Sequence, residues 1–129
     1  MKKIALLFLL VAAFAVSASA QEWPLSNTPY LCRWQTPSNA NGKALVTITF
    51  TSTSPDGLTK SGTMKTVYSN ASSLDRQINV TWDWASWSYT RFFYSQPNEG
   101  VSCYLTTSGN GSSVAWTGCS NSNAQQCFQ

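Results

Sequence analysis

The sequence predicts a small, secreted, all-β domain, and three observations lead to this fold class. Apolar and polar residues alternate with a period of two in several short stretches, which is the pattern of half-buried strands. Clusters of Pro, Gly and Asn separate these stretches at hairpin spacing. Four cysteines in a chain with an export signal are typical of two disulfides. We therefore expect one antiparallel β-sandwich or barrel of about seven strands, stapled by disulfides.

Residues 1–20 are predicted to be a secretory signal peptide rather than part of the fold. Two lysines at positions 2 and 3 precede an apolar run over residues 4–16, and residues 18–20 (Ala-Ser-Ala) form a small-residue cleavage site. The apolar run is too short to span a bilayer, and no second run follows it. We expect a mature, secreted, extracellular protein that begins at Gln21 and has no transmembrane segment.

The mature chain is expected to consist of an arm and one domain. Residues 21–29 contain two prolines and no alternation, which predicts an extended N-terminal arm. Residues 30–129 are enough for one modest hydrophobic core and are assigned to a single β domain. The expected strands, each with alternating or β-branched residues, are 30–34, 44–51, 58–68, 77–84, 87–94, 101–105 and 114–119.

Turn residues mark the connections between these strands. In residues 54–57 (Ser-Pro-Asp-Gly), Pro presets φ at the second position and Gly accepts the left-handed conformation. Gly62 interrupts the following strand and predicts a β-bulge. Further turns are expected at residues 96–100 and 108–111, which contain Pro, Asn and Gly.

The stretch Gln77–Tyr94 is rich in aromatic residues and reads as a hairpin. Apolar residues occupy the even positions from 78 to 84, and the phase of the alternation flips after Ala85 and Ser86. A hairpin that turns at residues 85–86 explains this flip. It pairs residue 84 with 87, 82 with 89 and 78 with 93, and it places all these side chains on one face.

The cysteines allow three disulfide connectivities, of which we expect one. Cys119 and Cys127 are the nearest pair in sequence, and their bond would pin the C-terminal tail to the last strand. Cys32 would then bond with Cys103 and tie the first strand to a late one. The alternative is Cys32 with Cys127 and Cys103 with Cys119.

Composition argues against catalysis, metal binding and nucleic-acid binding. The chain has no His, and its four Cys are expected to be oxidised, so we expect no catalytic residue, no metal and no cofactor. Without the signal peptide, six basic and five acidic residues give a net charge of +1, which does not favour nucleic acid as a partner. The one enzymatic alternative is a glycoside hydrolase that uses Asp83 and Glu99 as paired carboxylates.

The aromatic hairpin is the candidate binding site. Flat aromatic faces stack on sugar rings and also form hot spots in protein interfaces. We expect Trp84 and Trp87, at the tip, to form an exposed platform, and Trp82 to support it from the core. The predicted ligand-binding residues are Trp84, Trp87, Tyr89, Asp83 and Arg91. The favoured function is a non-catalytic, lectin-like module that binds an extracellular polysaccharide or glycan.

Two other functions remain as alternatives, a small-molecule carrier with an avidin- or lipocalin-like barrel and a protein-binding or structural secreted factor. Trp-x-Trp at residues 82–84, the run Cys-Tyr-Leu-Thr-Thr-Ser-Gly at 103–109 and Val-Ala-Trp at 114–116 resemble avidin-type barrels over about residues 42–116. The resemblance implies a closed barrel of eight strands. The polar biotin contacts of avidins have no counterparts that can be placed on this sequence, so we assign no family.

Three Asn-x-Ser/Thr sequons are candidates for N-glycosylation, at Asn70, Asn79 and Asn110. Asn70 and Asn110 fall in expected loops. Asn79 falls on the polar face of an expected strand.

Overall fold

The computed structural model describes residues 22–36, 39–120 and 125–128. The predicted signal peptide and Gln21 therefore lie outside the described residues. The strands are β1 (Pro29–Thr36), β2 (Asn39–Thr53), β3 (Thr59–Tyr68), β4 (Ser73–Trp82), β5 (Arg91–Gln96), β6 (Val101–Thr107), β7 (Ser113–Thr117) and β8 (Gln125–Phe128). A short 3₁₀ turn, η1 (Trp84–Ser86), lies between β4 and β5.

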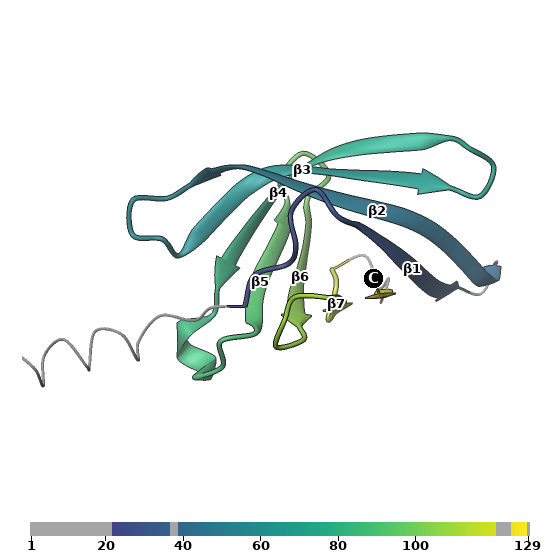
Figure 1. Cartoon of the computed structure of the whole chain (residues 1–129). Helices are drawn as coiled ribbons and strands as arrows, with labels where there is room; N and C mark the ends of the chain where they lie inside the picture. Colours follow the sequence, from purple (N-terminus) through teal and green to yellow (C-terminus); the bar gives the residue numbers. More distant parts are fainter. Residues whose placement is uncertain (1–21, 37–38, 121–124, 129) are drawn as a thin grey trace, which may run out of the picture.

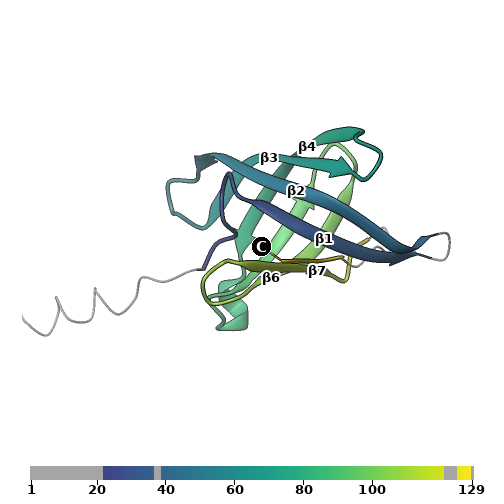
Figure 2. The ribbon, with the colours of Figure 1, turned by 45° about the vertical axis from the view of Figure 1, so that its right-hand side comes forward.

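The strands form one antiparallel sheet that closes on itself. Each strand pairs with the next along the chain, and β1 also pairs with β8, which closes the barrel (Figures 1 and 2). The predicted all-β antiparallel fold is confirmed, in the barrel form rather than the sandwich form. An eighth strand exceeds the expected seven because residues 125–128 also join the sheet. No helix among the described residues is long and apolar enough to cross a membrane.

Alternation along each strand fills the barrel with apolar side chains. In β2, for example, Val46 and Ile48 are buried and Leu45 is exposed. One contiguous core cluster forms in this way. Its buried members are Tyr30, Cys32, Val46, Ile48, Met64, Ile78, Val80, Phe92, Tyr94, Cys103, Leu105, Val114 and Trp116.

The N-terminal arm packs against this core instead of extending away from it. The Trp23 ring lies 4.7 Å from the ring of buried Phe92, centroid to centroid, and the Lys60 ammonium lies 5.1 Å above the Trp23 ring. The Tyr30 hydroxyl accepts a hydrogen bond from the Leu25 amide at 2.7 Å and donates one to the Gly111 carbonyl. Burial raises the pKa of this hydroxyl. The arm therefore covers one part of the core and is tied to both β1 and the β6–β7 turn.

The register of the β4–β5 hairpin differs from the predicted one. Trp82 pairs with Phe92 and Val80 with Tyr94, not Trp82 with Tyr89 or residue 78 with 93. The shift by an odd number of residues sends Phe92 inward and Phe93 outward, so the predicted common face is wrong. The register differs because the turn is longer than predicted. Ala85 and Ser86 do not readily adopt the positive φ angles of a two-residue hairpin loop, and the chain turns over residues 83–90 instead.

The predicted disulfide pairing is also wrong. Cys103, on β6, bonds with Cys119, just after β7, so Cys32–Cys103 and Cys119–Cys127 are both excluded. Adjacent antiparallel strands bring Cys119 back beside Cys103, with a Cα–Cα distance of 4.1 Å. Cys32 is disulfide-bonded as well, and the residue opposite its backbone on β8 is Cys127. The side chain of Cys127 lies outside the described part of the chain.

Gly111→Ala is expected to lower the free energy of unfolding by about 3 kcal/mol. A left-handed backbone alone costs an alanine about 1–2 kcal/mol, and here the added Cβ would also lie 2.6 Å from the Trp23 carbonyl oxygen. Gly57→Ala is the matched control, because Gly57 has a similar positive φ and no neighbouring atom within 4 Å of the added Cβ. Urea denaturation of the two variants measures the difference. Equal losses would contradict a tight contact between the arm and the β6–β7 turn.

Alkaline pH is expected to destabilise the barrel through Tyr94. Burial raises the pKa of Tyr94 to about 12, while the unfolded group titrates near about 10. The folded state binds the Tyr94 proton more tightly than the unfolded state does. The stability that protonated Tyr94 contributes is therefore fully present below about pH 10 and is lost as pH rises towards about 12. Unfolding free energies over this interval should fall more steeply for the unchanged protein than for Tyr94→Phe. Parallel curves would contradict the prediction.

Candidate functional site

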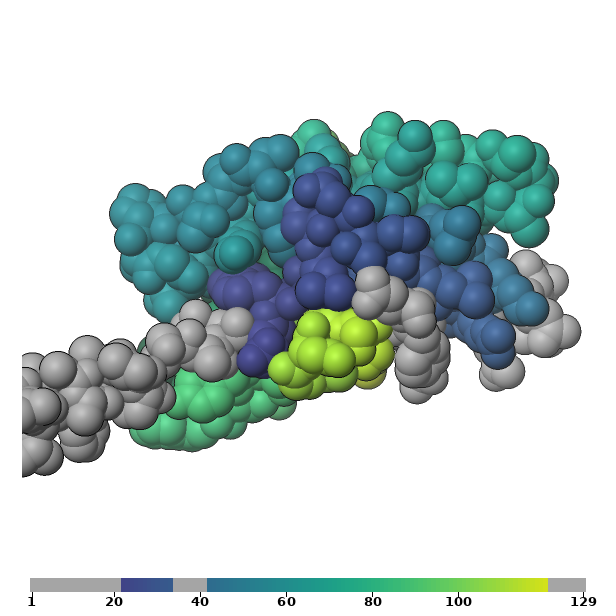
Figure 3. Space-filling view, viewed as in Figure 1, coloured from purple at the N-terminus to yellow at the C-terminus, as the bar shows by residue number. Residues whose placement is uncertain are grey.

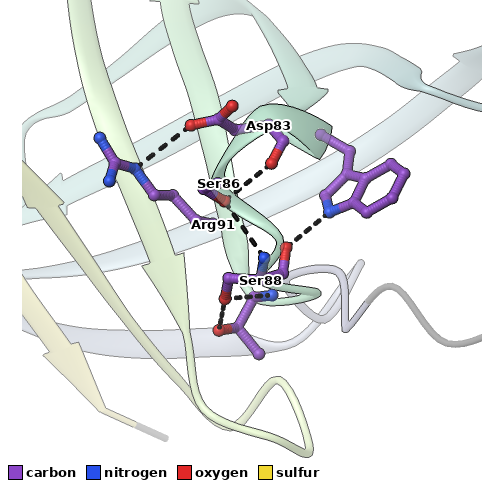
Figure 4. A network of polar contacts seen from close by, with 6 residues as sticks. Asp83, Ser86, Ser88 and Arg91 are labelled. Carbon is purple, nitrogen blue, oxygen red and sulfur yellow. Dashed lines mark hydrogen bonds and ion pairs between the residues drawn. The ribbon is translucent and has the colours of Figure 1, made fainter.

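The candidate site is the loop of residues 83–90, which we call the aromatic loop. It begins with η1, in which the Ser86 amide and hydroxyl donate to the Asp83 carbonyl at 3.2 and 2.8 Å. Trp87 follows in the left-handed conformation with φ of 56°, and its amide donates to the Trp84 carbonyl. Short polar contacts thus replace the missing turn residues and give the loop a defined conformation (Figure 4).

Both ends of the aromatic loop are held together at the barrel. The Asp83 carboxylate lies 3.4 Å from Arg91 Nε (Figure 4). The Asp83 amide also donates to the Arg91 carbonyl at 3.0 Å. Asp83 is only 5% exposed, so the Arg91 guanidinium lies where it compensates a buried carboxylate. The Thr107 amide on β6 donates to the Thr90 carbonyl at 2.8 Å. Asp83 and Arg91 therefore form the structural base of the loop.

The N-terminal arm supports the other side of the aromatic loop. The Glu22 amide donates to the Tyr89 carbonyl at 2.9 Å, and the Thr107 hydroxyl donates to the Glu22 carbonyl at 2.5 Å. In the space-filling view the loop forms the projecting lobe below the arm (Figure 3). Glu22 thus joins the aromatic loop to β6, through one backbone bond and one bond from a Thr side chain. No pattern in the sequence predicted this link.

The aromatic loop exposes the two tryptophans that were predicted at its tip. Trp84 is 64% exposed and Trp87 is 91% exposed. Tyr89, half exposed, stacks on Trp82 with an angle of 8° between the rings and 5.9 Å between their centroids. The Trp82 indole donates to the Ser88 carbonyl at 2.8 Å and packs partly buried against the core. The contact between Trp82 and Tyr89 therefore exists although the predicted strand register is wrong.

A second group of aromatic side chains, which sequence reasoning missed, lies on the outer face of β5 and β6. The rings of Phe93 and Tyr104 lie 5.6 Å apart, and the Arg91 guanidinium lies 4.3 Å above the Tyr104 ring. The predicted hairpin paired Phe93 with Ile78 and placed both side chains on one face, whereas Ile78 is buried and Phe93 is exposed. Only the correct register reveals that it is exposed beside Tyr104.

The structure does not bring the two candidate catalytic carboxylates together. Asp83 pairs with Arg91 at the first residue of β5, and Glu99 is exposed in the turn that follows Gln96, the last residue. The six residues of β5 separate these positions by roughly 17 Å, whereas glycosidase carboxylates lie about 5–9.5 Å apart. Among the described residues, no group of three or more His, Cys, Asp or Glu side chains is placed to hold a metal ion.

The three sequons lie in different surroundings. Asn70 and Asn110 are exposed in turns, and each accepts a hydrogen bond from the hydroxyl of the Ser two residues later. Asn79 is half-buried on β4, where its amide oxygen accepts a hydrogen bond from Ser61 at 2.7 Å. Glycosylation of the three residues stays a prediction.

Trp87→Gly is expected to raise the free energy of unfolding by up to about 1 kcal/mol, because glycine adopts the left-handed backbone without steric conflict and little packing is lost. Trp87→Ala keeps the backbone strain and should change stability by at most about 0.5 kcal/mol. Trp82→Ala removes a half-buried ring and should lower stability by about 3 kcal/mol. Urea denaturation of the three variants tests this order, and a large loss for Trp87→Ala would show that the ring is structural.

The closed barrel of eight strands has the architecture implied by the resemblance to avidin-type barrels. The comparisons with known proteins do not extend this likeness. No family model matches the chain, and neither the curated proteins nor the solved structures contain a match.

Proposed function

We propose that this protein is a secreted, non-catalytic module that binds an extracellular polysaccharide through its aromatic loop. The observation that carries the proposal is Trp87. Its backbone adopts a conformation that is unfavourable for a bulky residue, and its ring is 91% exposed, so packing does not offset the strain. Backbone strain that no packing contact compensates is typical of a functional site.

The surroundings of Trp87 suit a sugar ligand. Trp84 presents a second exposed ring one turn earlier, and Tyr89 presents a half-exposed ring that Trp82 holds in place. The half-buried hydroxyls of Ser86 and Ser88 lie in the same loop and already make hydrogen bonds within it, so their remaining acceptor capacity is what they offer to a sugar hydroxyl. Flat rings beside neutral hydroxyls match the mixed apolar and polar surface of a carbohydrate.

The interior of the barrel favours this proposal over a small-molecule carrier. Tyr30, Phe92 and Leu105 are fully buried in the core cluster, and Trp23 packs on the same cluster from the arm. The exposed rings of the aromatic loop point to a ligand that binds at the surface. A protein partner remains the alternative for the same rings, since exposed tryptophans also serve as interface hot spots.

Retention on insoluble polysaccharides tests the proposal. The mature protein is expected to sediment with at least one of cellulose, chitin, xylan, β-1,3-glucan and mannan. Trp84→Ala combined with Trp87→Ala should reduce retention at least about tenfold, as truncation of hot-spot aromatics does, without loss of the folded state.

Leu45→Ala is the matched control, because Leu45 is an exposed apolar residue on the outer face of β2, away from the loop. Its retention should equal that of the unchanged protein. Failure to sediment with every polymer would overturn the glycan ligand and favour the protein-binding function. Unchanged retention of the double variant would remove the aromatic loop as the binding site.

A further inference from the structure

A groove of about 290 Å³ lies on the outer surface of the barrel, over β4, β5 and β6. Its volume is just below the range for small-ligand sites, which is about 300–1,000 Å³, so it has room for about one sugar unit rather than several. Two tilted aromatic rings contribute to its wall, Phe93 at 47% exposure and Tyr104 at 39%. The polar side chains among its lining residues are Asn79, Thr81, Ser95 and Ser102.

The chemistry of this groove resembles that of the aromatic loop. Its polar side chains are neutral amides and hydroxyls, and none of the residues that line it carries a formal charge at neutral pH. Asn79 and Thr81 are oriented by the neighbouring strand β3, because Ser61 donates to the Asn79 amide oxygen at 2.7 Å and the Thr59 and Thr81 hydroxyls lie 3.0 Å apart. Exposed rings flanked by neutral hydrogen-bonding groups favour a sugar over an anion or a purely apolar ligand.

Arg91 joins the groove to the aromatic loop. Its Nε lies 3.4 Å from the Asp83 carboxylate at the base of the loop, and its guanidinium lies above the Tyr104 ring at the groove. Arg91 and Phe93 are two residues apart on β5 and point to the same side of the sheet, which separates them by roughly 7 Å. Arg91 therefore lies between the base of the aromatic loop and the two rings of the groove.

We propose that the groove is a second sugar-binding site, which holds a further unit of the same polysaccharide chain that binds the aromatic loop. The inference rests on the proposed function and adds one requirement: the oligosaccharide must be long enough to reach both sites. A chain that reaches from the loop across Arg91 to Phe93 and Tyr104 makes two sets of contacts, whereas a short oligosaccharide makes one. Linked contacts raise affinity without any change in either site.

Calorimetric titration with oligosaccharides of two and six units tests this requirement. The probes are the cello-, chito-, xylo-, laminari- or manno-oligosaccharides that correspond to the polymer on which the protein is retained. The protein is produced in a bacterial periplasm, where disulfides form and where mass spectrometry can verify that Asn79 carries no glycan of its own in the groove. We expect the hexasaccharide to bind at least about tenfold more tightly than the disaccharide.

Phe93→Ala combined with Tyr104→Ala should lower hexasaccharide affinity about tenfold and leave disaccharide affinity within about twofold. Ser102→Arg keeps both rings and fills the groove from an exposed position, so it should cause the same selective loss even if the double variant folds poorly. Tyr104→Phe keeps the ring and should bind like the unchanged protein.

The outcomes separate this inference from the proposed function. If Ser102→Arg and the folded double variant bind the hexasaccharide with full affinity, the groove is not a binding site, although the aromatic loop still is. If Trp84→Ala with Trp87→Ala leaves both affinities unchanged, the aromatic loop itself fails as the site. If the disaccharide loses as much affinity as the hexasaccharide in the groove variants, the effect is structural and the inference is overturned.

Discussion

In a closed antiparallel barrel, the pairing of each strand with its two neighbours decides which of its side chains point into the core and which point outwards. Every strand pairs on both sides, so its register with one neighbour must agree with its register to the other. In β5, this condition places Phe92 and Tyr94 in the core and leaves Arg91 and Phe93 on the outside. Both the packed interior and the outer aromatic surface depend on that single alternation.

Sequence alone predicted the parts of the fold that local chemistry determines. The turn at residues 54–57 is present. The bulge expected near Gly62 is found on the opposite strand, where the register of β2 shifts after Phe50. Gly62 has no room for a side chain, because a Cβ added to it would lie 1.9 Å from the Thr49 carbonyl oxygen. The β4–β5 register was not predicted, because the aromatic loop carries no turn motif to reveal its length. The Cys103–Cys119 bond appeared only in the alternative pairing, because the spacing of four cysteines does not by itself decide which of them bond.

For the candidate site, sequence reasoning located the exposed tryptophans but not what holds them. The aromatic loop is held by the ion pair of the buried Asp83 with the partly exposed Arg91, by backbone hydrogen bonds from the arm and β6, and by the stack of Trp82 on Tyr89. Asp83 and Arg91 were predicted to contact ligand directly, and the structure gives them a supporting position. A loop fixed in advance loses less conformational freedom on binding, which favours affinity from a few exposed rings.

Closure of the barrel through β1 and β8 has a consequence for how the chain folds. Leu31 pairs with Phe128, 97 positions later, so the closing contact is among the most distant in sequence. Such non-local pairing slows folding, because the entropy of bringing distant segments together is lost before their contacts form. During synthesis, β1 retains an unpaired edge until β8 is available. That edge is the place where a folding intermediate can pair with a second chain, so chaperones that shield strand edges should raise the yield of the native barrel.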